Sequence, residues 1–308
     1  MRPSNKSSHL VTAGHEQAGQ VFERVRPRLW QIAYRMLASF ADADDAVQDT
    51  YIKWHGVEHR TIENPEAWLV TACTRRCIDL LRASQRTRVD YVGMWLPEPV
   101  IGDPVETPDD HVALAESLRV AFLLLLDRLS ATERAAYLLR DVFDYTYGDI
   151  ATVLNKSEAA CRQIVSRAKK CLEAGREAGG LSEERHAVLL EIFLETLASG
   201  DTNGLARVLA ADVELIGDGG GKAPATLEVI KSADGVAAFL ITVWSNVWKD
   251  FEVEVTPVNG TPGFLLWHEN SVVGAVSLAA TEAGTLRRVY IVRNPDKLRH
   301  LNRPSTDG

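Results

Sequence analysis

The sequence predicts a multidomain chain: two all-α helical domains, the second with a helix-turn-helix, joined by a Pro-rich linker and followed by an α+β domain. In two long stretches apolar residues recur at three- and four-residue steps, which indicates amphipathic helices. Between them, prolines forbid a regular helix; they are Pro97, Pro99, Pro104 and Pro108. After residue 181 alternating apolar positions are separated by glycines, a pattern typical of strands.

Composition limits the class of protein. The 308 residues are 46% hydrophobic and 25% charged, which is typical of a soluble globular chain with more than one domain. The net charge of −8 argues against binding nucleic acid by bulk attraction alone, although a local basic surface stays open. No apolar run is long enough to span a membrane, and the polar N-terminus does not resemble a signal peptide. We expect a cytoplasmic protein.

Four cysteines suggest no metal centre. They lie on predicted helices without CxxC spacing: Cys73, Cys77, Cys161 and Cys171. Cys73 and Cys77 are four residues apart and could share a metal, but no nearby His or Cys pair completes four ligands. We expect core thiols in a reducing compartment, with no metal and no cofactor.

The first helical domain is expected over 21–88, after a flexible N-terminus at 1–20. Its first helix carries the apolar stripe Phe22, Val25, Leu29, Ile32 and Met36. Asp42 is expected to cap a second helix, and Asn64 a third that has Pro65 at its first position. The third helix turns Trp68 inward and leaves Arg75, Arg76 and Arg82 on a more polar side.

The linker is expected over 89–110 and the second helical domain over 111–177. "WLPEP", residues 95–99, is too apolar for a passive linker, so we expect Trp95 and Leu96 to dock on another domain. Ser130 with Glu133, and Thr146 with Asp149, predict capping boxes. Ser157 caps the last helix after a short turn, which completes a helix-turn-helix.

That last helix has two predicted faces. Its apolar face carries Cys161, Ile164, Val165, Ala168 and Leu172. Its outward face and surroundings are basic and polar, comprising Lys156, Arg162, Gln163, Ser166, Arg167, Lys169 and Lys170. Arg and Gln read base edges and Lys and Arg neutralise phosphates, so this face predicts a recognition helix in a major groove. A merely solvated helix face is the alternative.

A short acidic helix predicts a different partner. In "DADDAVQDTYIKW", residues 42–54, the side chains of Asp44, Asp45, Gln48 and Asp49 project together. Such a face repels phosphate and suits a basic protein surface. An acidic face without a partner is the alternative.

The α+β domain is expected over 181–300, with a flexible tail at 301–308. An amphipathic helix precedes the strands, and a further helix is expected over 235–246. Asn259-Gly260 is a strong hairpin signal. Strands near 213–215, 251–258, 264–267, 272–278 and 286–292 are expected to form a curved antiparallel sheet.

"DADDAVQDTYIKW" and "NPEAWLVTACTRRCIDLLR", residues 64–82, resemble the conserved-core region of bacterial extracytoplasmic-function (ECF) sigma factors. "LSATERAAYLLRDVFDYTYGDIATVLNKSEAACRQIVSRAKKCL" resembles their upstream-promoter-reading domain. Both occur in order within about residues 22–172. The resemblance implies an initiation factor, not an enzyme, that recruits RNA polymerase core enzyme and binds promoter DNA as duplex and melted strand.

The resemblance also implies residue roles. Asp45, Gln48 and Asp49 would meet the clamp helices of the largest polymerase subunit. Along the downstream promoter element and its melted strand would lie Asn64, Trp68, Arg75, Arg76 and Arg82. Single-stranded bases need stacking surfaces and backbone cations, which these residue types supply.

The extension after residue 181 resembles the SnoaL-like, ketosteroid-isomerase-type cone, fused in one subgroup of these factors. There it is thought to regulate in cis, in place of a separate anti-sigma protein. Three motifs resemble the marks of that subgroup: "WLPEP" (Trp95, Leu96, Pro97, Glu98, Pro99), "DGGGK" (Asp218 to Lys222) and "NPDKL" (Asn294, Pro295, Asp296, Lys297, Leu298). We expect Asp218, Lys222, Asp296 and Lys297 to pair across an interface between domains.

The sequence leaves three alternatives. "DGGGK" could cradle phosphate, but Lys222 is followed by Ala223 and Pro224, so a strand-end loop with positive-φ glycines is the better interpretation. An enzymatic cone would draw on Asp218, Trp244, Trp267 and His268, which show no evident acid–base spacing. A helix-turn-helix regulator whose cone binds a small ligand is the third, and whether the cone has a ligand stays open.

Overall fold

The computed structural model describes residues 6–87, 91–102, 116–173 and 181–303. Pro104 and Pro108 of the expected linker lie outside these ranges, as do the start of the second helical domain and the end of the tail. The chain divides into two compact units. One comprises 1–86 and 126–174, and the other comprises 87–125 and 175–308. The linker that was expected between the helical domains therefore clusters with the α+β domain.

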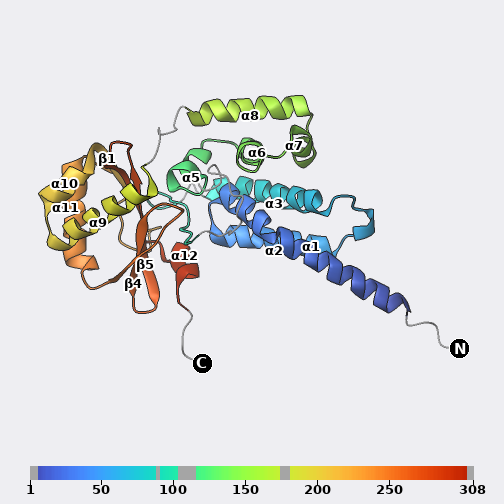
Figure 1. Cartoon of the computed structure of the whole chain (residues 1–308), viewed down its shortest axis with the longest axis horizontal. Coiled ribbons are helices and arrows are strands. Elements are labelled where there is room, and N and C mark those ends of the chain that lie inside the picture. The colour runs from blue at the N-terminus through green and yellow to red at the C-terminus, as the bar shows by residue number, and fades with distance from the viewer. Residues whose placement is uncertain (1–5, 88–90, 103–115, 174–180, 304–308) are drawn as a thin grey trace. The chain divides into compact units, whose positions relative to one another are not determined.

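The first unit is helical (Figure 1). Its elements are α1 (Lys6–Leu37), α2 (Phe40–His55), η1 (His59–Thr61), α3 (Pro65–Thr87), α6 (Ala131–Tyr137), η3 (Leu138–Val142), α7 (Tyr147–Leu154) and α8 (Glu158–Glu173). Helix α1 begins at Lys6, within the segment 1–20 for which no regular structure was expected.

The stripe predicted on the first helix forms part of the core of this unit, together with an apolar face of α2. On α1 the buried residues include Phe22, Val25, Leu29, Ile32 and Met36, and on α2 they include Ala43, Val47, Thr50 and Trp54. The start of α2 corrects one prediction. Helix α2 begins at Phe40 because the Ser39 side chain accepts a hydrogen bond from the Asp42 N–H, so Asp42 lies in the first turn and is not the cap.

The other helix starts follow the sequence signals. Asn64 Oδ1 accepts from the Ala67 N–H ahead of α3. Both predicted capping boxes form, at Ser130 and at Thr146. At the turn of the helix-turn-helix, Asn155 ends α7 in the left-handed region and Ser157 Oγ accepts from the Ala160 N–H at the start of α8.

The second unit contains the α+β domain. Its elements are α9 (Glu183–Ser199), α10 (Thr202–Val208), β1 (Leu209–Asp218), β2 (Ile230–Lys231), α11 (Ala233–Val243), η4 (Trp244–Trp248), β3 (Glu252–Val255), β4 (Gly263–His268), β5 (Ser271–Ala280), β6 (Leu286–Val292), α12 (Pro295–Leu298) and η5 (Arg299–Leu301). Helix α5 (Val120–Leu126) belongs to this unit except for its last residue, where the chain passes to the first unit.

The six strands form one curved sheet in the order β2-β1-β6-β5-β4-β3. The predicted sheet was antiparallel throughout, which is wrong for one pair, because β1 and β6 run parallel. Strands that are far apart in sequence can pair in parallel when helices and other strands intervene, as they do here. At the predicted hairpin, Asn259 and Gly260 both have positive φ, as a tight turn of this kind requires.

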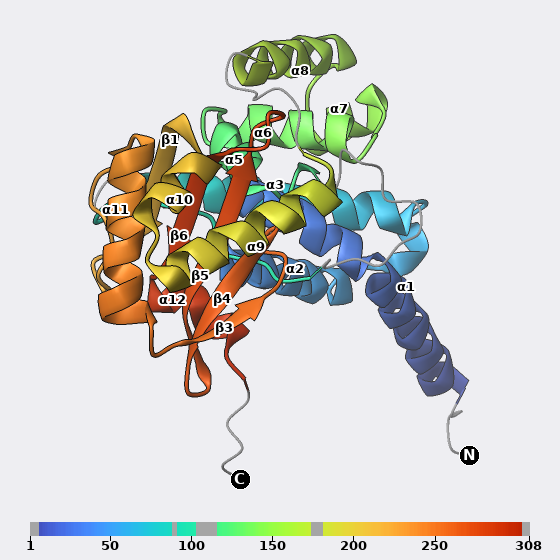
Figure 2. The same ribbon diagram turned by 60° about the vertical axis from the view of Figure 1, so that its left-hand side comes forward.

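Both faces of the sheet are covered, so β4 is buried at five successive residues from Gly263 to Trp267. Helices α9, α10 and α11 cover one face of the sheet (Figure 2). The core on this face includes Phe193, Leu240 and Phe264. The other face carries a second cluster, to which the linker contributes Leu96 and α12 contributes Leu298. These helices on a curved mixed sheet confirm the expected α+β fold class.

Candidate functional site

Helix α8, which was predicted to be a recognition helix, has the two faces that the sequence predicts. Buried are Cys161, Ile164, Val165, Ala168 and Leu172. Exposed are Lys156, Arg162, Gln163, Ser166, Arg167, Lys169 and Lys170. A basic, polar surface of this kind has the donors and acceptors that contacts to phosphates and base edges require.

Arg162 on this exposed face is held by its neighbours. Its Nη2 lies 2.7 Å from Glu158 Oε2, one helical turn earlier. Its guanidinium carbon lies 4.9 Å from the ring centroid of Tyr147, the first residue of α7. Arg140 approaches the same ring to 5.2 Å. An ion pair and a cation–π contact therefore restrict this long side chain.

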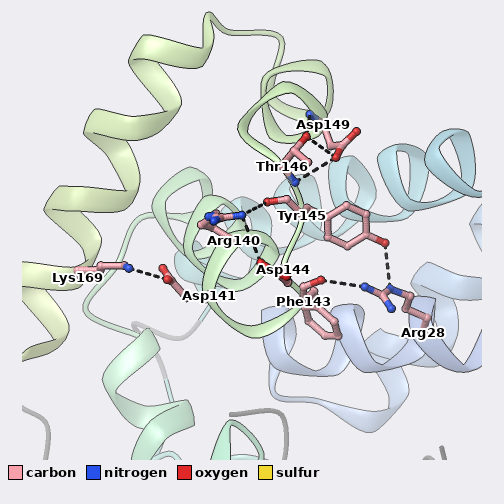
Figure 3. A network of polar contacts seen from close by, with 9 residues as sticks. All are labelled: Arg28, Arg140, Asp141, Phe143, Asp144, Tyr145, Thr146, Asp149 and Lys169. Carbon is pink, nitrogen blue, oxygen red and sulfur yellow. Dashed lines mark hydrogen bonds and ion pairs between the residues drawn. The ribbon is translucent and has the colours of Figure 1, made fainter. Parts of the chain in front are cut away.

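Lys169 is directed toward a carboxylate of its own unit. Its Nζ lies 2.6 Å from Asp141 Oδ1 in η3, and this hydrogen bond raises the pKa of Lys169 (Figure 3). Lys169 was predicted to contact phosphate. In the described structure it links α8 to η3, which precedes α7 in the chain.

The segment between η3 and α7 is bound by α1 (Figure 3). Arg28 donates from Nε to the Tyr145 hydroxyl at 3.0 Å and from Nη2 to the Phe143 carbonyl at 2.9 Å. Arg28 and Arg35 also approach the Phe143 ring to 5.7 and 5.6 Å. Burial raises the pKa of Tyr145, so its hydroxyl stays neutral. These contacts join the first helical segment to the helix-turn-helix.

On the acidic helix α2 the predicted residues divide into two groups. Asp44, Asp45 and Gln48 are exposed. Asp49 is instead half-buried, and its Oδ2 accepts from Arg76 Nε at 2.6 Å. A residue predicted to contact the polymerase is thus paired with one predicted to contact the promoter.

Helix α3 carries the remaining residues of the predicted downstream-element surface. Trp68 packs on Trp54 with ring centroids 5.3 Å apart, which leaves it half-buried. Arg75 donates from Nε to the Val153 carbonyl and from Nη2 to the Thr152 carbonyl, both at 2.8 Å. These carbonyls end α7, where a cation is favoured by the helix dipole. Arg82 lies 3.4 Å from Thr132 Oγ1 in α6.

In the second unit, the linker binds the α+β domain through a buried charged group. Asp218 is fully buried at the end of β1. Its Oδ2 accepts from the Leu96 N–H at 2.8 Å and lies 2.7 Å from Lys297 Nζ. Its Oδ1 accepts from the Tyr91 hydroxyl at 2.5 Å. Burial, and then the hydrogen bond to Asp218, raise the pKa of Tyr91, so this hydroxyl remains a donor.

Lys297 completes this linker-docking site, which we define as Tyr91, Trp95, Leu96, Asp218 and Lys297. Its Nζ also donates to the Leu96 carbonyl and lies 4.3 Å from the Trp95 ring centroid and 5.0 Å from that of Tyr91. A buried ammonium needs such compensation for its lost hydration. The site therefore fixes "WLPEP" to the domain.

The "DGGGK" loop takes the form expected of a strand-end turn. Gly220 and Gly221 have φ of +58° and +70°. A Cβ at Gly221 would lie 3.2 Å from Val92 Cβ, so the loop also approaches the linker closely. Lys222 pairs with Asp296, and Asp218 pairs with Lys297. All four residues belong to the α+β domain, so the prediction that these residues pair between domains is wrong.

The rest of "WLPEP" and "NPDKL" adds to the same contact. Asn294 caps α12 and donates from Nδ2 to the Tyr91 hydroxyl at 2.9 Å, and Pro295 is the first residue of that helix. Pro97 and Pro99 are buried and Glu98 is half-buried. The Pro99 carbonyl lies 2.8 Å from His300 Nε2.

These contacts bear on the enzymatic alternative. Asp218 is bonded to three groups and has no exposed surface. Trp267 donates to Glu254 at 2.7 Å, and His268 packs against Phe251. The candidate acid is therefore committed to holding the linker.

Three residues that take part in these contacts were not predicted: Tyr91, Arg28 and Tyr147. Tyr91 stands four residues before Trp95 in the linker, and a second aromatic residue so close to "WLPEP" was a usable signal. Arg28 contacts Tyr145, which is 117 positions away in the chain, and Tyr147 contacts Arg162 in the next helix. No local sequence pattern indicates contacts of this kind.

Comparison with known proteins agrees with this arrangement. Residues 21–87 match the family model for Sigma-70 region 2, and residues 119–172 match that for Sigma-70, region 4. The ECF RNA polymerase sigma factor SigJ of Mycobacterium tuberculosis is 36% identical over 222 residues, 71% of each chain. The probable ECF RNA polymerase sigma factor SigI of the same species is 26% identical over 92% of this chain and 96% of its own.

A solved structure extends the likeness over both units. The crystal structure of the M. tuberculosis extracytoplasmic function sigma factor SigJ matches with a TM-score of 0.70 and 28% identity. The match covers 91% of this chain and 98% of that one. No helix within the described ranges is long and apolar enough to cross a membrane.

The helix-turn-helix with its basic face, the helices of region 2 and the α+β extension thus occur together in the order found in these relatives. Such proteins bind RNA polymerase core enzyme and direct promoter-specific initiation, and they are not enzymes. The chain belongs to the ECF RNA polymerase sigma factors, in the subgroup with a fused C-terminal SnoaL-like domain.

Proposed function

We propose that the SnoaL-like domain regulates this sigma factor in cis through the linker-docking site. The observation that carries the proposal is the bonding of Leu96 and Trp95 to Asp218 and Lys297. The linker leads from α3 to α5 in the chain. A domain that binds the linker therefore restricts the positions that region 2 and region 4 can adopt relative to each other.

The contacts within the helical unit support a state in which Arg75 is bonded within the protein and not to promoter DNA. Arg75 is assigned here to the promoter, yet two of its donors are used by carbonyls of α7. We infer that these bonds break when Arg75 meets promoter DNA. A switch of this kind works only if the two states differ by a few kcal/mol, since a partner shifts an equilibrium by no more than its differential affinity.

The residue roles belong to the same proposal. Exposed Asp45 and Gln48 on α2 are assigned to the polymerase, with Asp49 acting beside Arg76. The promoter surface comprises Asn64, Trp68, Arg75, Arg76 and Arg82 for the downstream element and Lys156, Arg162, Gln163, Ser166, Arg167, Lys169 and Lys170 for the upstream element. Exposure of the α8 residues supports the second assignment.

Because the regulating domain is part of the chain, we propose that no separate anti-sigma protein is required and that the factor acts in the cytoplasm. A small ligand of the SnoaL-like domain would then act by lowering or raising the affinity of the domain for the linker.

The test is promoter-dependent transcription with purified core polymerase alone. Variant Trp95→Ala, Asp218→Ala removes two members of the linker-docking site, and Met94→Ala, at an exposed linker residue, is the matched control. We expect the double variant to change transcript yield while the control does not. Equal yields from all three proteins would refute regulation through the linker and leave the family assignment intact.

The polymerase role has its own test. Asp45→Lys reverses an exposed charge on α2, and Glu23→Lys reverses an exposed charge on α1 as the control. Asp45→Lys should weaken co-purification with core enzyme. Unchanged co-purification would remove Asp45 from the interface.

A further inference from the structure

We propose that Tyr147 is a positioning residue for promoter recognition, which holds Arg162 in the conformation that reads a base. The proposal rests on the base-reading role proposed for Arg162. It adds a residue of α7 to a function that the sequence located only in α8 and Lys156.

The ring of Tyr147 is itself fixed. Tyr147 follows Thr146. The Thr146 hydroxyl accepts a hydrogen bond from the Asp149 N–H, and the Thr146 N–H donates to Asp149 Oδ2 at 3.1 Å. This capping box sets the first turn of α7. The ring therefore starts from a defined backbone position at the N-terminus of the helix that packs against α8.

Arg162 is restrained from two sides. The Tyr147 ring lies 4.9 Å from its guanidinium carbon, and Glu158 accepts from its Nη2 at 2.7 Å. A guanidinium has five N–H donors in a fixed fork, so a single bond to Glu158 leaves donors for the O6 and N7 atoms of a guanine. More than half of the side chain is exposed, which leaves this fork open to DNA.

Pre-organisation is the physical gain. A free arginine side chain loses much rotamer freedom when it binds a base, and a side chain that is already held loses less. The effect falls on the base pair that Arg162 reads. It does not extend to phosphate contacts made elsewhere on α8.

The test uses the full-length protein with core polymerase and upstream elements selected by the wild-type holoenzyme from randomised DNA. Binding is measured to each single-base variant of the selected element. Arg162→Ala should abolish discrimination at one base pair. Tyr147→Leu should reduce discrimination at that same base pair by about threefold, the worth of an exposed cation–π contact. Tyr147→Phe keeps the ring and should restore discrimination.

A second variant changes Glu158, the other partner of Arg162. Glu158→Gln removes a negative charge that repels DNA, so it should strengthen binding to every variant and yet lower discrimination at the Arg162 base pair. This variant keeps the proposal testable should Tyr147→Leu impair folding.

The outcomes separate the two claims. If Arg162→Ala weakens all DNA variants equally, the base-reading role fails and the positioning role with it. If Arg162→Ala is base-specific but Tyr147→Leu acts equally at all positions, or its effect adds fully to that of Arg162→Ala in the double variant, Tyr147 has a structural role only. Loss at one shared position, with no further loss in the double variant, supports the proposal.

Discussion

Lys297 in the SnoaL-like domain and Arg162 in α8 have the same two kinds of partner, a carboxylate and an aromatic ring. Lys297 lies 2.7 Å from Asp218 and 4.3 Å from the Trp95 ring, and Arg162 lies 2.7 Å from Glu158 and 4.9 Å from the Tyr147 ring. Their surroundings differ. The Lys297 side chain is 7% exposed and that of Arg162 is 55% exposed.

This difference in exposure distinguishes a pair that fixes a segment of the chain from a pair whose cation can still bind a ligand. Inside the protein the pair has no water to replace a missing partner, so each group depends on the other. At the surface, water and salt screen the pair, and the cation stays available to an outside ligand. The same chemistry therefore fixes the linker in one place and, in our proposal, prepares a DNA contact in the other.

The largest effect is expected at the buried pair. Lys297→Met leaves the Asp218 carboxylate without its cation and should lower the free energy of unfolding by about 3 kcal/mol or more. Arg162→Met removes an exposed pair and should lower it by no more than about 1 kcal/mol. Urea titration of the full-length protein, followed by tryptophan fluorescence, measures both.

A double variant sharpens this prediction. Asp218→Asn with Lys297→Met removes both charges, and it should be more stable than Lys297→Met alone because no unpaired charge stays buried. Equal losses in the free energy of unfolding for Lys297→Met and Arg162→Met would show that burial does not determine what each pair contributes to stability.

The second prediction applies the same rule inside the helical unit. Arg134 is 1% exposed and donates to the Met36 carbonyl at 2.8 Å and to Asp127 at 2.5 Å. Arg134→Met should lower the free energy of unfolding by about 3 kcal/mol, since Asp127 and the carbonyls of Met36 and Leu126 each lose a donor.

Arg26 is the matched control for Arg134. It pairs with Glu23 at 3.7 Å with 54% of its side chain exposed, and Arg26→Met should cost well under about 1 kcal/mol. A large loss in the control would show that exposure does not govern these pairs.

The third prediction concerns pH and the SnoaL-like unit. Burial lowers the pKa of His186, and burial also lowers that of His300, whose Nε2 lies beside the Pro99 carbonyl. The unfolded chain then binds more protons than the folded chain as pH falls through the ordinary histidine range near about 6.5, so stability declines. We expect the urea midpoint to drop between about pH 7.5 and about pH 5.5.

Removing the imidazoles should flatten this dependence. A double variant His186→Gln, His300→Gln is the comparison. A midpoint that rises on acidification, or a slope unchanged in the double variant, would contradict the assignment to these two groups.

The sequence predicted what local rules determine. The stripe on α1, the two faces of α8 and the caps at Ser130, Thr146 and Ser157 depend on residues within a few positions of each other, and all were confirmed. Family motifs supplied the domain types, because these motifs occur at their usual spacing.

Pairing between distant residues was less predictable. Lys222 and Asp296 pair within one domain, and β1 pairs with β6 in parallel, because the curved sheet brings these segments together. The bond of Tyr91 to Asp218 spans 127 positions, and no periodicity in the sequence encodes such a contact. Ser39 took the cap predicted for Asp42 because it stands one residue before the helix start.

The smallest predicted effect compares two helix starts, one in each unit. Thr146 makes a complete capping box at α7, whereas Ser182 stands at the N-cap of α9 without a side-chain hydrogen bond to the helix. Thr146→Ala should lower the free energy of unfolding by about 1 kcal/mol, the usual worth of a cap, and Ser182→Ala should leave it nearly unchanged. Thr146→Ser keeps the hydroxyl and should recover most of the loss. Because the capping box also positions the Tyr147 ring beside Arg162, Thr146→Ala should in addition reduce base discrimination at the position that Arg162 reads, while Ser182→Ala should not. Equal stability of the two alanine variants would show that the hydroxyl of Thr146 contributes nothing, and α7 would then owe its start to packing against α8 alone.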